Sequence, residues 1–431
     1  MKYFPIKFHI IYILSTLLFS FYGPRIYANY DKFSVSLFIL SYLTIVFISF
    51  KFGFRSRTIY SRNFQKNKNK LYVLFTNCLN ISIIIYLIYF IYLFSSNRIN
   101  LSISSIGNNY VEYYQYYSEK KETTEFTPEL FFLIFLSIPK FISLTIGFLK
   151  FRKHENKIKY KFVFLILLII FINTISSGNQ KSLGDIIIIA LLALMTNYKY
   201  FTNPEKQKIK IYTIIILLLS LLFFSFSQFQ RLDSRSISIV ELNRLAPDYY
   251  NYDINHPIFK LFGEKIGLGL TAFLSGYLSN GYYGLSICLN MPFEWSYGIG
   301  NSVALTNLTE KFTNIEVFNH TYLSRLEQFG LLGKMHWHTI FPWLASDLTF
   351  VGSIIAFIPI GYIYGKSWKE SYIFNNDVSF LMFSLLSILF IFIPANNQIM
   401  HGYDAFLCTL FVSTYWILNH NKANNINLSN E

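Results

Sequence analysis

The chain has 431 residues, of which 53% are hydrophobic and only 14% charged, and its formal net charge is +14. Soluble domains carry about 25% charged residues, so this composition excludes an average soluble enzyme. In a soluble protein, a net charge of +14 would suggest that the protein binds nucleic acid. Here most Lys and Arg lie in short loops between apolar segments, and that placement argues against nucleic acid.

Ten apolar segments follow one another along the chain. A membrane-spanning helix needs about 20 mostly apolar residues, and several segments reach or approach that length. No small-residue cleavage site follows the first segment, so we expect a retained helix and not a signal peptide. The sequence predicts an all-α polytopic integral membrane protein with about ten transmembrane helices. We place them at 8–23, 33–50, 71–94, 130–149, 162–176, 183–197, 209–227, 342–365, 378–394 and 403–418.

The distribution of basic residues predicts the orientation of these helices. Seven Lys or Arg lie in 51–70 and six in 150–161, two short loops on the same side of the predicted bundle. Short loops rich in Lys and Arg stay in the cytoplasm. We therefore expect both termini inside, with one large loop outside.

This topology divides the chain into four parts. Residues 266–290 are apolar but contain five glycines, so they are a candidate re-entrant or interfacial segment, with a full span as the rival interpretation. The tail is rich in Asn and is expected to be disordered. The parts are an N-terminal membrane bundle at 1–227 of about seven spans with an outward loop at 95–129, the large outward loop at 228–341, a C-terminal bundle at 342–418 of about three spans, and a cytoplasmic tail at 419–431.

Arginines gather where the large loop begins, against the trend that keeps positive charge inside. Arg231 and Arg235 are four residues apart and share a face if the preceding helix continues outward, and Arg244 follows. Guanidinium groups bind phosphate oxygens through forked hydrogen bonds, which makes these three candidate phosphate ligands. The alternative is anchoring at lipid headgroups or pairing with nearby acids.

Two lysines stand out near or inside the spans. Lys181 lies in the polar turn 176–185 and is a fourth candidate phosphate ligand, unless the turn simply faces water. Lys140 follows Pro139 in the middle of a predicted span. A charge within a membrane is costly and is a functional candidate by default, with snorkelling to the surface as the alternative.

The end of the large loop carries the candidate acid–base residues. His338 is a candidate general base, because imidazole titrates near neutral pH, and Asp347 could orient a base, bind a sugar hydroxyl or cap the next helix. His336 and His338 supply at most two metal ligands, so we expect no metal site. Trp337 and Tyr297 could stack on sugar rings or lie at the membrane interface.

Missing motifs narrow the function further. The sequence has no Walker-type loop and no GxGxxG, so we expect neither ATP nor a dinucleotide, and no other cofactor. The first outward loop, 24–32, has Asp31 as its one acidic residue. It therefore lacks the paired acids of metal-dependent membrane glycosyltransferases. The three cysteines are far apart in the sequence and predict neither a disulfide framework nor a thiolate metal site.

Three sequence features together resemble the bacterial O-antigen and capsule repeat-unit polymerases of the Wzy type. The first is the Ser-Gly-x-x-Lys turn at 177–181, where relatives often carry Ser-Gly-x-Arg. The second is the Gln-Arg stretch at 230–235 that opens the large loop. The third runs from Thr339 through Asp347 to Gly352, similar to the family's Thr…Asp-Phe-Gly element, although here Asp347 is followed by Leu and Thr.

The resemblance implies a block transfer of glycan at the periplasmic face of the bacterial inner membrane, without metal or nucleotide. An acceptor hydroxyl of one lipid-linked repeat unit attacks the growing chain, and polyprenyl diphosphate leaves. It further implies a chain-length regulator and a flippase as partners. In this interpretation the diphosphate ligands are Arg231, Arg235, Arg244 and Lys181, and the base or orienting residue is His338 or Asp347.

Two other functions fit the same sequence. An O-antigen ligase or another polyprenyl-linked glycan transferase would share the spans and the large loop. A lipid-linked oligosaccharide flippase would be a transporter, and charges from many helices around a central cavity would favour it. Repeat-unit structure, linkage and the choice between lipopolysaccharide and capsule depend on features outside this sequence.

Overall fold

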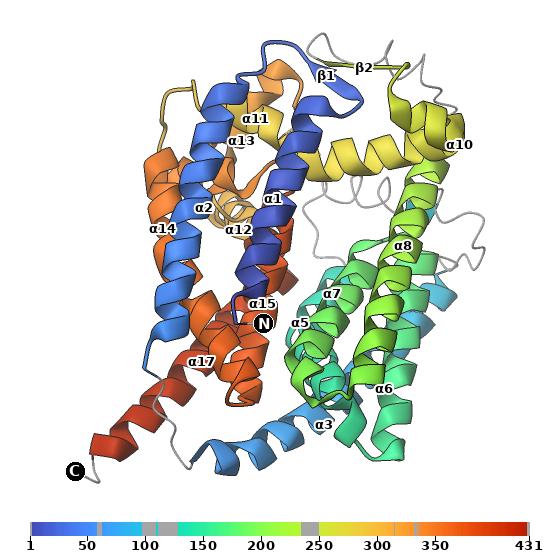
Figure 1. The fold of residues 1–431 in the computed structure, drawn as a ribbon, viewed down its shortest axis with the longest axis vertical. Coiled ribbons are helices and arrows are strands. Elements are labelled where there is room, and N and C mark those ends of the chain that lie inside the picture. Colours follow the sequence, from blue (N-terminus) through green and yellow to red (C-terminus); the bar gives the residue numbers. More distant parts are fainter. Residues whose placement is uncertain are drawn as a thin grey trace. The chain divides into compact units, whose positions relative to one another are not determined.

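The computed structural model is almost entirely helical (Figure 1). It describes residues 2–57, 63–96, 109–110, 128–233, 250–313, 315–331, 333 and 336–428. Within these ranges one sheet is found, in which β1 (Arg25–Tyr27) and β2 (Tyr250–Tyr252) pair antiparallel.

The chain divides into two compact units, and each is discontinuous in sequence. Unit 1 is formed by Met1–Gly53, Leu221–Gly365 and Leu389–Gly402, and unit 2 by Phe54–Ser220, Lys366–Ile388 and Tyr403–Glu431. Three helices pass from one unit into the other, namely α8 (Asn203–Asp233), α14 (Ile340–Tyr372) and α15 (Asp377–Phe392).

The remaining helices belong to one unit each, apart from the last two residues of α2, which fall in unit 2. In unit 1 they are α1 (Phe4–Tyr22), α2 (Lys32–Arg55), α10 (Pro257–Phe273), η5 (Leu274–Ser279), α11 (Asn280–Cys288), α12 (Val303–Thr313), η6 (Val317–His320), α13 (Tyr322–Arg325), η7 (Leu326–Phe329) and α16 (Gln398–His401). In unit 2 they are α3 (Asn63–Ser95), α5 (Pro128–Lys150), η2 (Phe151–Lys153), α6 (Asn156–Ile169), η3 (Ile170–Ser176), α7 (Lys181–Asn197), η4 (Tyr198–Tyr200) and α17 (Tyr403–Leu428).

Eight helices in the described chain are long and apolar enough to cross a membrane, and they coincide with the first eight predicted spans. The all-α, multi-pass character is therefore confirmed. The ninth predicted span corresponds to α15, a shorter apolar helix of 16 residues, and the tenth lies in α17, which is helical but is not one of the eight.

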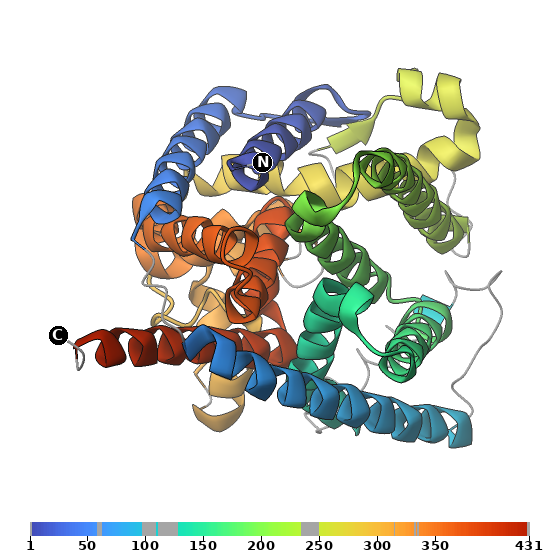
Figure 2. The same cartoon turned by 60° about the horizontal axis from the view of Figure 1, so that its bottom comes forward.

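The segment at 266–290 is built differently from the spans. It consists of α10, the π-helical turn η5 and α11, and none of these is a candidate span. Gly263 interrupts α10 with φ +73°, a conformation that glycine adopts without strain. In unit 1 these helices run across the end of α1, and they are not aligned with it (Figures 1 and 2).

Polar side chains join the helices of unit 1. His9 on α1 hydrogen-bonds the Tyr42 hydroxyl on α2 at 2.8 Å, and Thr16 hydrogen-bonds Tyr282 on α11 at 2.8 Å. The backbone N–H of Ile340 donates to the carbonyl of Ile393 at 2.9 Å, which ties the start of α14 to the segment after α15.

Glycines allow α2 and α14 to approach closely. A Cβ at Gly53 would clash with the carbonyl oxygen of Tyr362, and one at Gly361 would lie 3.0 Å from the Cβ of Ser49. The two helices therefore touch backbone to backbone within unit 1.

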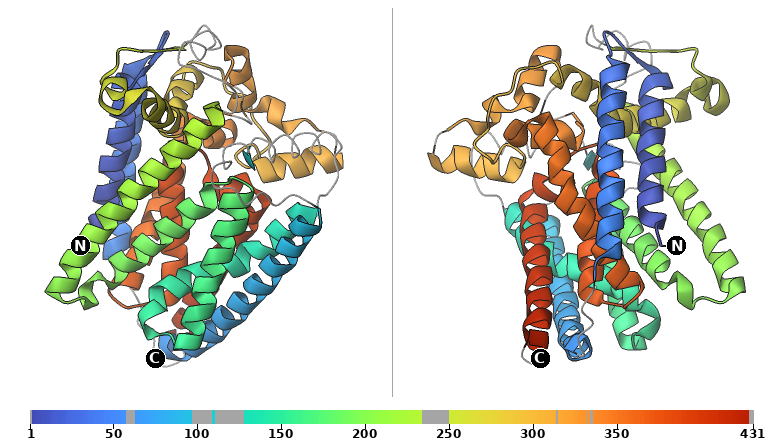
Figure 3. Two further views of the ribbon diagram at one scale, coloured as in Figure 1. Left: turned by 90° about the vertical axis from the view of Figure 1, so that its right-hand side faces the viewer. Right: turned by 60° about the vertical axis from the view of Figure 1, so that its left-hand side comes forward.

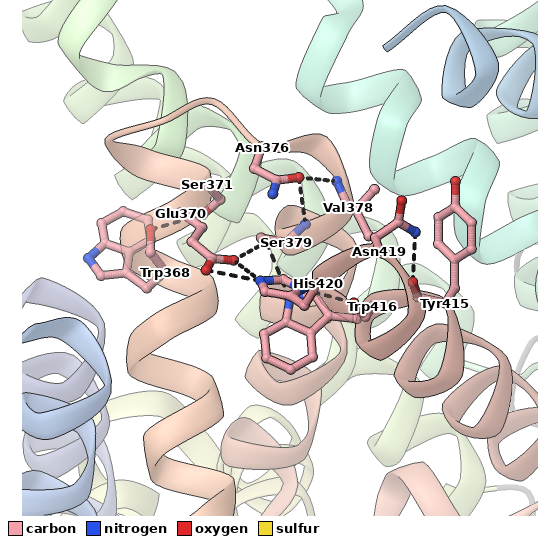
Figure 4. A network of polar contacts seen from close by, with 10 residues as sticks. All are labelled: Trp368, Glu370, Ser371, Asn376, Val378, Ser379, Tyr415, Trp416, Asn419 and His420. Carbon is pink, nitrogen blue, oxygen red and sulfur yellow. Dashed lines mark hydrogen bonds and ion pairs between the residues drawn. The ribbon is translucent and has the colours of Figure 1, made fainter. Parts of the chain in front are cut away.

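Unit 2 is a bundle in which α5 packs against α3, α7 and α17 (Figure 3). Its helix ends are joined by a buried polar network around Glu370 (Figure 4). His420 Nε2 lies 3.0 and 2.9 Å from the two carboxyl oxygens of Glu370, and the Ser379 hydroxyl donates to Oε2. The carbonyl of Trp416 can only accept, so Nδ1 of His420 donates to it at 2.9 Å, and a proton lies between Nε2 and Glu370.

Replacing Gly53 by Val should destabilise unit 1, because the side chain would force α2 away from α14. Overpacking of this kind costs about 1–3 kcal/mol. We expect a lower melting temperature for the detergent-solubilised protein in thermal unfolding followed by size-exclusion chromatography. Gly276→Ala is the control, since a Cβ there meets nothing within 4 Å; equal melting temperatures for both variants would contradict the close approach.

Replacing Glu370 by Ala should destabilise unit 2 more strongly, because His420 and Ser379 lose their common acceptor. Breaking a buried ion pair from one side costs about 3–5 kcal/mol. The same unfolding assay measures this loss. Glu205→Gln, which removes an exposed pair with Arg152 at 3.2 Å, should leave the melting temperature unchanged. A Glu370→Ala protein as stable as this control would show that the network does not hold the helix ends.

Candidate functional site: an arginine pocket in unit 1

The antiparallel pairing of β1 with β2 fixes the position of Arg25. In this register Arg25 lies opposite Tyr252. Its guanidinium carbon is 4.4 Å from the ring centre of Tyr250 and 5.0 Å from that of Tyr252. The Tyr252 hydroxyl also accepts a hydrogen bond from Nη2. Stacking and hydrogen bonding together hold the guanidinium in one orientation.

Arg25 lines a partly open pocket of about 120 Å³. Its Nη1 donates to Oδ1 of the buried Asn280 at 2.9 Å, whereas Nε is buried without a hydrogen-bond partner among the described residues. A buried donor without an acceptor is costly, so the guanidinium group beside the pocket is incompletely satisfied. The other lining residues are Tyr250, Gly276, Tyr277, Leu331, His336 and Trp337.

Arg231 lies directly behind this pocket. The helix before the large loop continues beyond the predicted end of its span at residue 227, and α8 ends at Asp233. The Arg231 side chain is only 8% exposed, and Nη1 donates to the hydroxyl of Tyr277 at 3.0 Å. The Tyr277 ring in turn lies 5.0 Å from that of Trp337. The two other predicted arginines, Arg235 and Arg244, lie outside the described residues.

The structure distinguishes the two histidines of the His-Trp-His sequence. His336 is exposed and lines the pocket, together with the predicted sugar-stacking residue Trp337. Partial desolvation, and then the nearby charge of Arg25, lower the pKa of His336, so its imidazole is neutral at pH 7. His338, the predicted base, is 1% exposed and packs against the glycine face of α11, where a Cβ on Gly284 would lie 3.1 Å from its Nδ1. His336 is therefore the histidine that a ligand in this pocket would meet.

Asp347 holds a loop. Its carboxylate accepts hydrogen bonds from the Ser296 hydroxyl at 2.6 Å, the Gly300 N–H at 3.2 Å, and the backbone and side chain of Asn301 at 2.9 and 2.8 Å. Helix capping was one of three roles considered for Asp347, and the structure gives that role to another residue. Thr349, with φ +64°, interrupts α14 and caps its second part by accepting from the N–H of Gly352 at 3.3 Å.

The loop that Asp347 holds carries Tyr297, the other predicted sugar-binding residue. Tyr297 has φ +59°, an uncommon conformation for a residue with a side chain. Its ring is exposed and lies 5.5 Å from both Trp295 and His320. It does not line the Arg25 pocket, so the two predicted aromatic contacts, Trp337 and Tyr297, belong to different surfaces of unit 1.

The predicted lysines belong to unit 2. Lys181 is the first residue of α7, and Lys140 lies in the middle of α5, as expected. Asp185 on α7 and Asp404 on α17 are within electrostatic reach of both lysines. Lys181 therefore belongs to a different unit from Arg231, and the pocket of unit 1 is lined by Arg25.

Sequence reasoning missed Arg25, Tyr250 and Asn280. Arg25 is the single arginine of the loop at 24–32. An outward arginine between two apolar segments is a signal of the same kind as Arg231. The strand pairing that brings Arg25 to Tyr250 joins residues more than 200 positions apart, so no local sequence pattern predicts it.

Comparison with protein-family models, with curated proteins and with solved structures finds no match for this chain. Across the described ranges, no group of three His, Cys, Asp or Glu side chains is arranged to hold a metal ion. The geometry of the site therefore carries the functional argument.

Replacing Asp347 by Ala should release the loop at 296–301, because four hydrogen bonds lose their acceptor. We expect limited proteolysis to cut this loop at least ten times faster than in the unchanged protein. Thr349→Ala, two residues on, removes only the helix cap and serves as the control. Cleavage at the unchanged rate in Asp347→Ala would rule out a loop-holding role.

Proposed function

We propose that the chain is a membrane glycosyltransferase that polymerises polyprenyl-diphosphate-linked oligosaccharide repeat units into O-antigen or capsular polysaccharide. The observation that carries the proposal is the Arg25 pocket. It combines a fixed guanidinium that has a spare buried donor, a second arginine one tyrosine away, and aromatic rings beside both. A sugar diphosphate needs cations for its phosphates and rings for its sugar, and this pocket offers both.

The proposed reaction needs no energy source beyond the donor itself. The hydroxyl oxygen of the acceptor repeat unit forms a bond to the anomeric carbon of the growing chain. The bond from that carbon to the diphosphate oxygen breaks, and polyprenyl diphosphate leaves with the electron pair. Negative charge on the diphosphate increases as the bond breaks, so cations placed there stabilise the transition state more than the ground state.

Residues of the pocket can take the remaining roles. The acceptor hydroxyl loses a proton, and neutral His336 is exposed in the pocket and able to accept it. Arg25 and Arg231 would bind the diphosphate, and Trp337 would stack on a sugar ring. Arg235 and Arg244, predicted for the diphosphate, would add to the same charge if they reach it.

The predicted topology suits this role. Pairing of β1 with β2 brings together the loops after the first and seventh spans, and the bond from Ile340 to Ile393 brings together the start of the eighth and the end of the ninth. Both contacts join segments that lie on the same side of the membrane in an arrangement with the N-terminus and C-terminus inside, and also in the inverted arrangement. In the proposal these segments face the periplasm of a bacterial inner membrane, and a flippase and a chain-length regulator act beside the enzyme.

The first test is deletion of the gene followed by electrophoresis of the surface glycan. The proposal expects the ladder to collapse to a single repeat unit on its carrier. Long polymer stranded on polyprenyl diphosphate would indicate a ligase instead, and repeat units trapped at the cytoplasmic face would indicate a flippase.

Replacing Arg25 by Ala, alone and with Arg231→Ala, should remove long chains while single-repeat product remains. We expect at least a 100-fold loss of polymer for the double variant, because both diphosphate cations are gone. Arg25→Lys should recover only part of the activity, since an ammonium group lacks the forked geometry.

Arg152→Ala provides the control for the loss of one positive charge, because Arg152 is an exposed residue of unit 2 paired with Glu205. It should leave the ladder unchanged. Normal chain lengths in a correctly inserted Arg25→Ala, Arg231→Ala protein would exclude this pocket as the diphosphate site.

A further inference from the structure

Four charged side chains lie near one another inside the helix bundle of unit 2. They are Lys140 on α5, Lys181 and Asp185 on α7, and Asp404 at the start of α17. Helix α5 packs against both α7 and α17, and each aspartate is within electrostatic reach of both lysines. The charges thus form one group of four and are not two isolated pairs.

The helices hold these charges apart. No ion pair of 4.0 Å or less joins any of the four, all of which are described in the structure. One carboxylate oxygen, Oδ1 of Asp185, is buried and has no hydrogen-bond partner in the described chain. Separated opposite charges in a poorly solvated interior are costly, so these four side chains are incompletely compensated within the described chain.

Uncharged polar groups surround the same place. Asn173 donates to the Tyr86 hydroxyl on α3 and to the Ser182 hydroxyl on α7, both at 3.1 Å. Asn173 lies in η3, a π-helical turn, and such turns occur often at functional sites. The Tyr86 hydroxyl is also within electrostatic reach of Lys140. We call these seven residues the polar core: Tyr86, Lys140, Asn173, Lys181, Ser182, Asp185 and Asp404.

The charge balance of the polar core limits what it can hold. Two ammonium groups and two carboxylates sum to zero. An anion attracted by the lysines would be repelled by the aspartates, and a cation attracted by the aspartates would be repelled by the lysines. What remains is an uncharged group that both accepts and donates hydrogen bonds, and the hydroxyls of a sugar ring do both.

We propose that the polar core binds a sugar ring of a lipid-linked glycan within the membrane bundle. The ammonium groups donate to sugar oxygens, and the carboxylates accept from sugar hydroxyls. The identity of the ligand rests on the proposed function, which makes such glycans the substrate. The rival explanation is that the four charges only compensate one another.

Neutralising one lysine and one aspartate, singly and together, distinguishes the two explanations. Lys140→Met and Asp404→Asn each leave an uncompensated charge, whereas the double variant restores neutrality. If the charges only compensate one another, the double variant will polymerise normally. If the polar core binds a sugar ring, the double variant should insert into the membrane at the unchanged level and yet make at least ten-fold less long-chain polymer. Arg152→Ala with Glu205→Gln, an exposed pair in the same unit, is the matched control and should polymerise normally.

Cys408 provides a direct readout that does not depend on polymer formation. It lies on α17 within electrostatic reach of Lys140, Lys181, Asp185 and Asp404, and the two other cysteines are Cys78 and Cys288. A Cys78→Ser, Cys288→Ser protein would be treated with 2-aminoethyl methanethiosulfonate, a small water-soluble thiol reagent. Labelling would be compared in cells that make lipid-linked repeat units and cells that make none.

The proposal expects Cys408 to react, and to react at least five-fold more slowly when repeat units are present. No reaction in either strain would show a dry core, and equal rates would show a core without glycan; either outcome overturns the proposal. Protection of Cys408 alongside an unchanged ladder in the deletion strain would support the sugar site and refute the polymerase.

Discussion

A polar side chain that enters a membrane bundle must find its partner inside the protein, and this constraint organises both units. Glu370 is buried with His420 and Ser379, and a single proton joins carboxyl and imidazole. Asp347 satisfies its carboxylate on the loop at 296–301. In each case one acid determines how segments far apart in sequence meet, because leaving it unpaired would cost more than ordering them.

The same constraint makes the exceptions informative. Arg25 is held by two tyrosines and Asn280, yet its Nε has no acceptor among the described residues. Asp185 is close to two lysines, yet none is near enough for an ion pair and one oxygen is unmatched. Each position is rigidly built and incompletely satisfied, which is what a site prepared for a polar ligand requires.

The two incomplete sites differ in charge, and so in what they suit. The pocket in unit 1 is lined by an arginine and backed by another, beside neutral aromatic and imidazole groups, which favours an anion. The polar core in unit 2 balances its lysines against aspartates and favours an uncharged group. A lipid-linked glycan contains both a diphosphate and sugar rings, so the proposed substrate would suit both sites.

The sequence alone determined the helical class and eight of the spans, because hydropathy is a local property of the chain. It also identified Lys140 as a charge within a span. The continuation of α8 past residue 227 to Asp233 comes from the structure. Only the tertiary structure decided that Arg25 lies beside the tyrosine that binds Arg231, that His336 and not His338 lines the pocket, and that Asp347 holds a loop. Those outcomes depend on a two-stranded pairing between residues 25 and 252 and on the glycine face of α11. Contacts over such separations are set by packing, which no local pattern records.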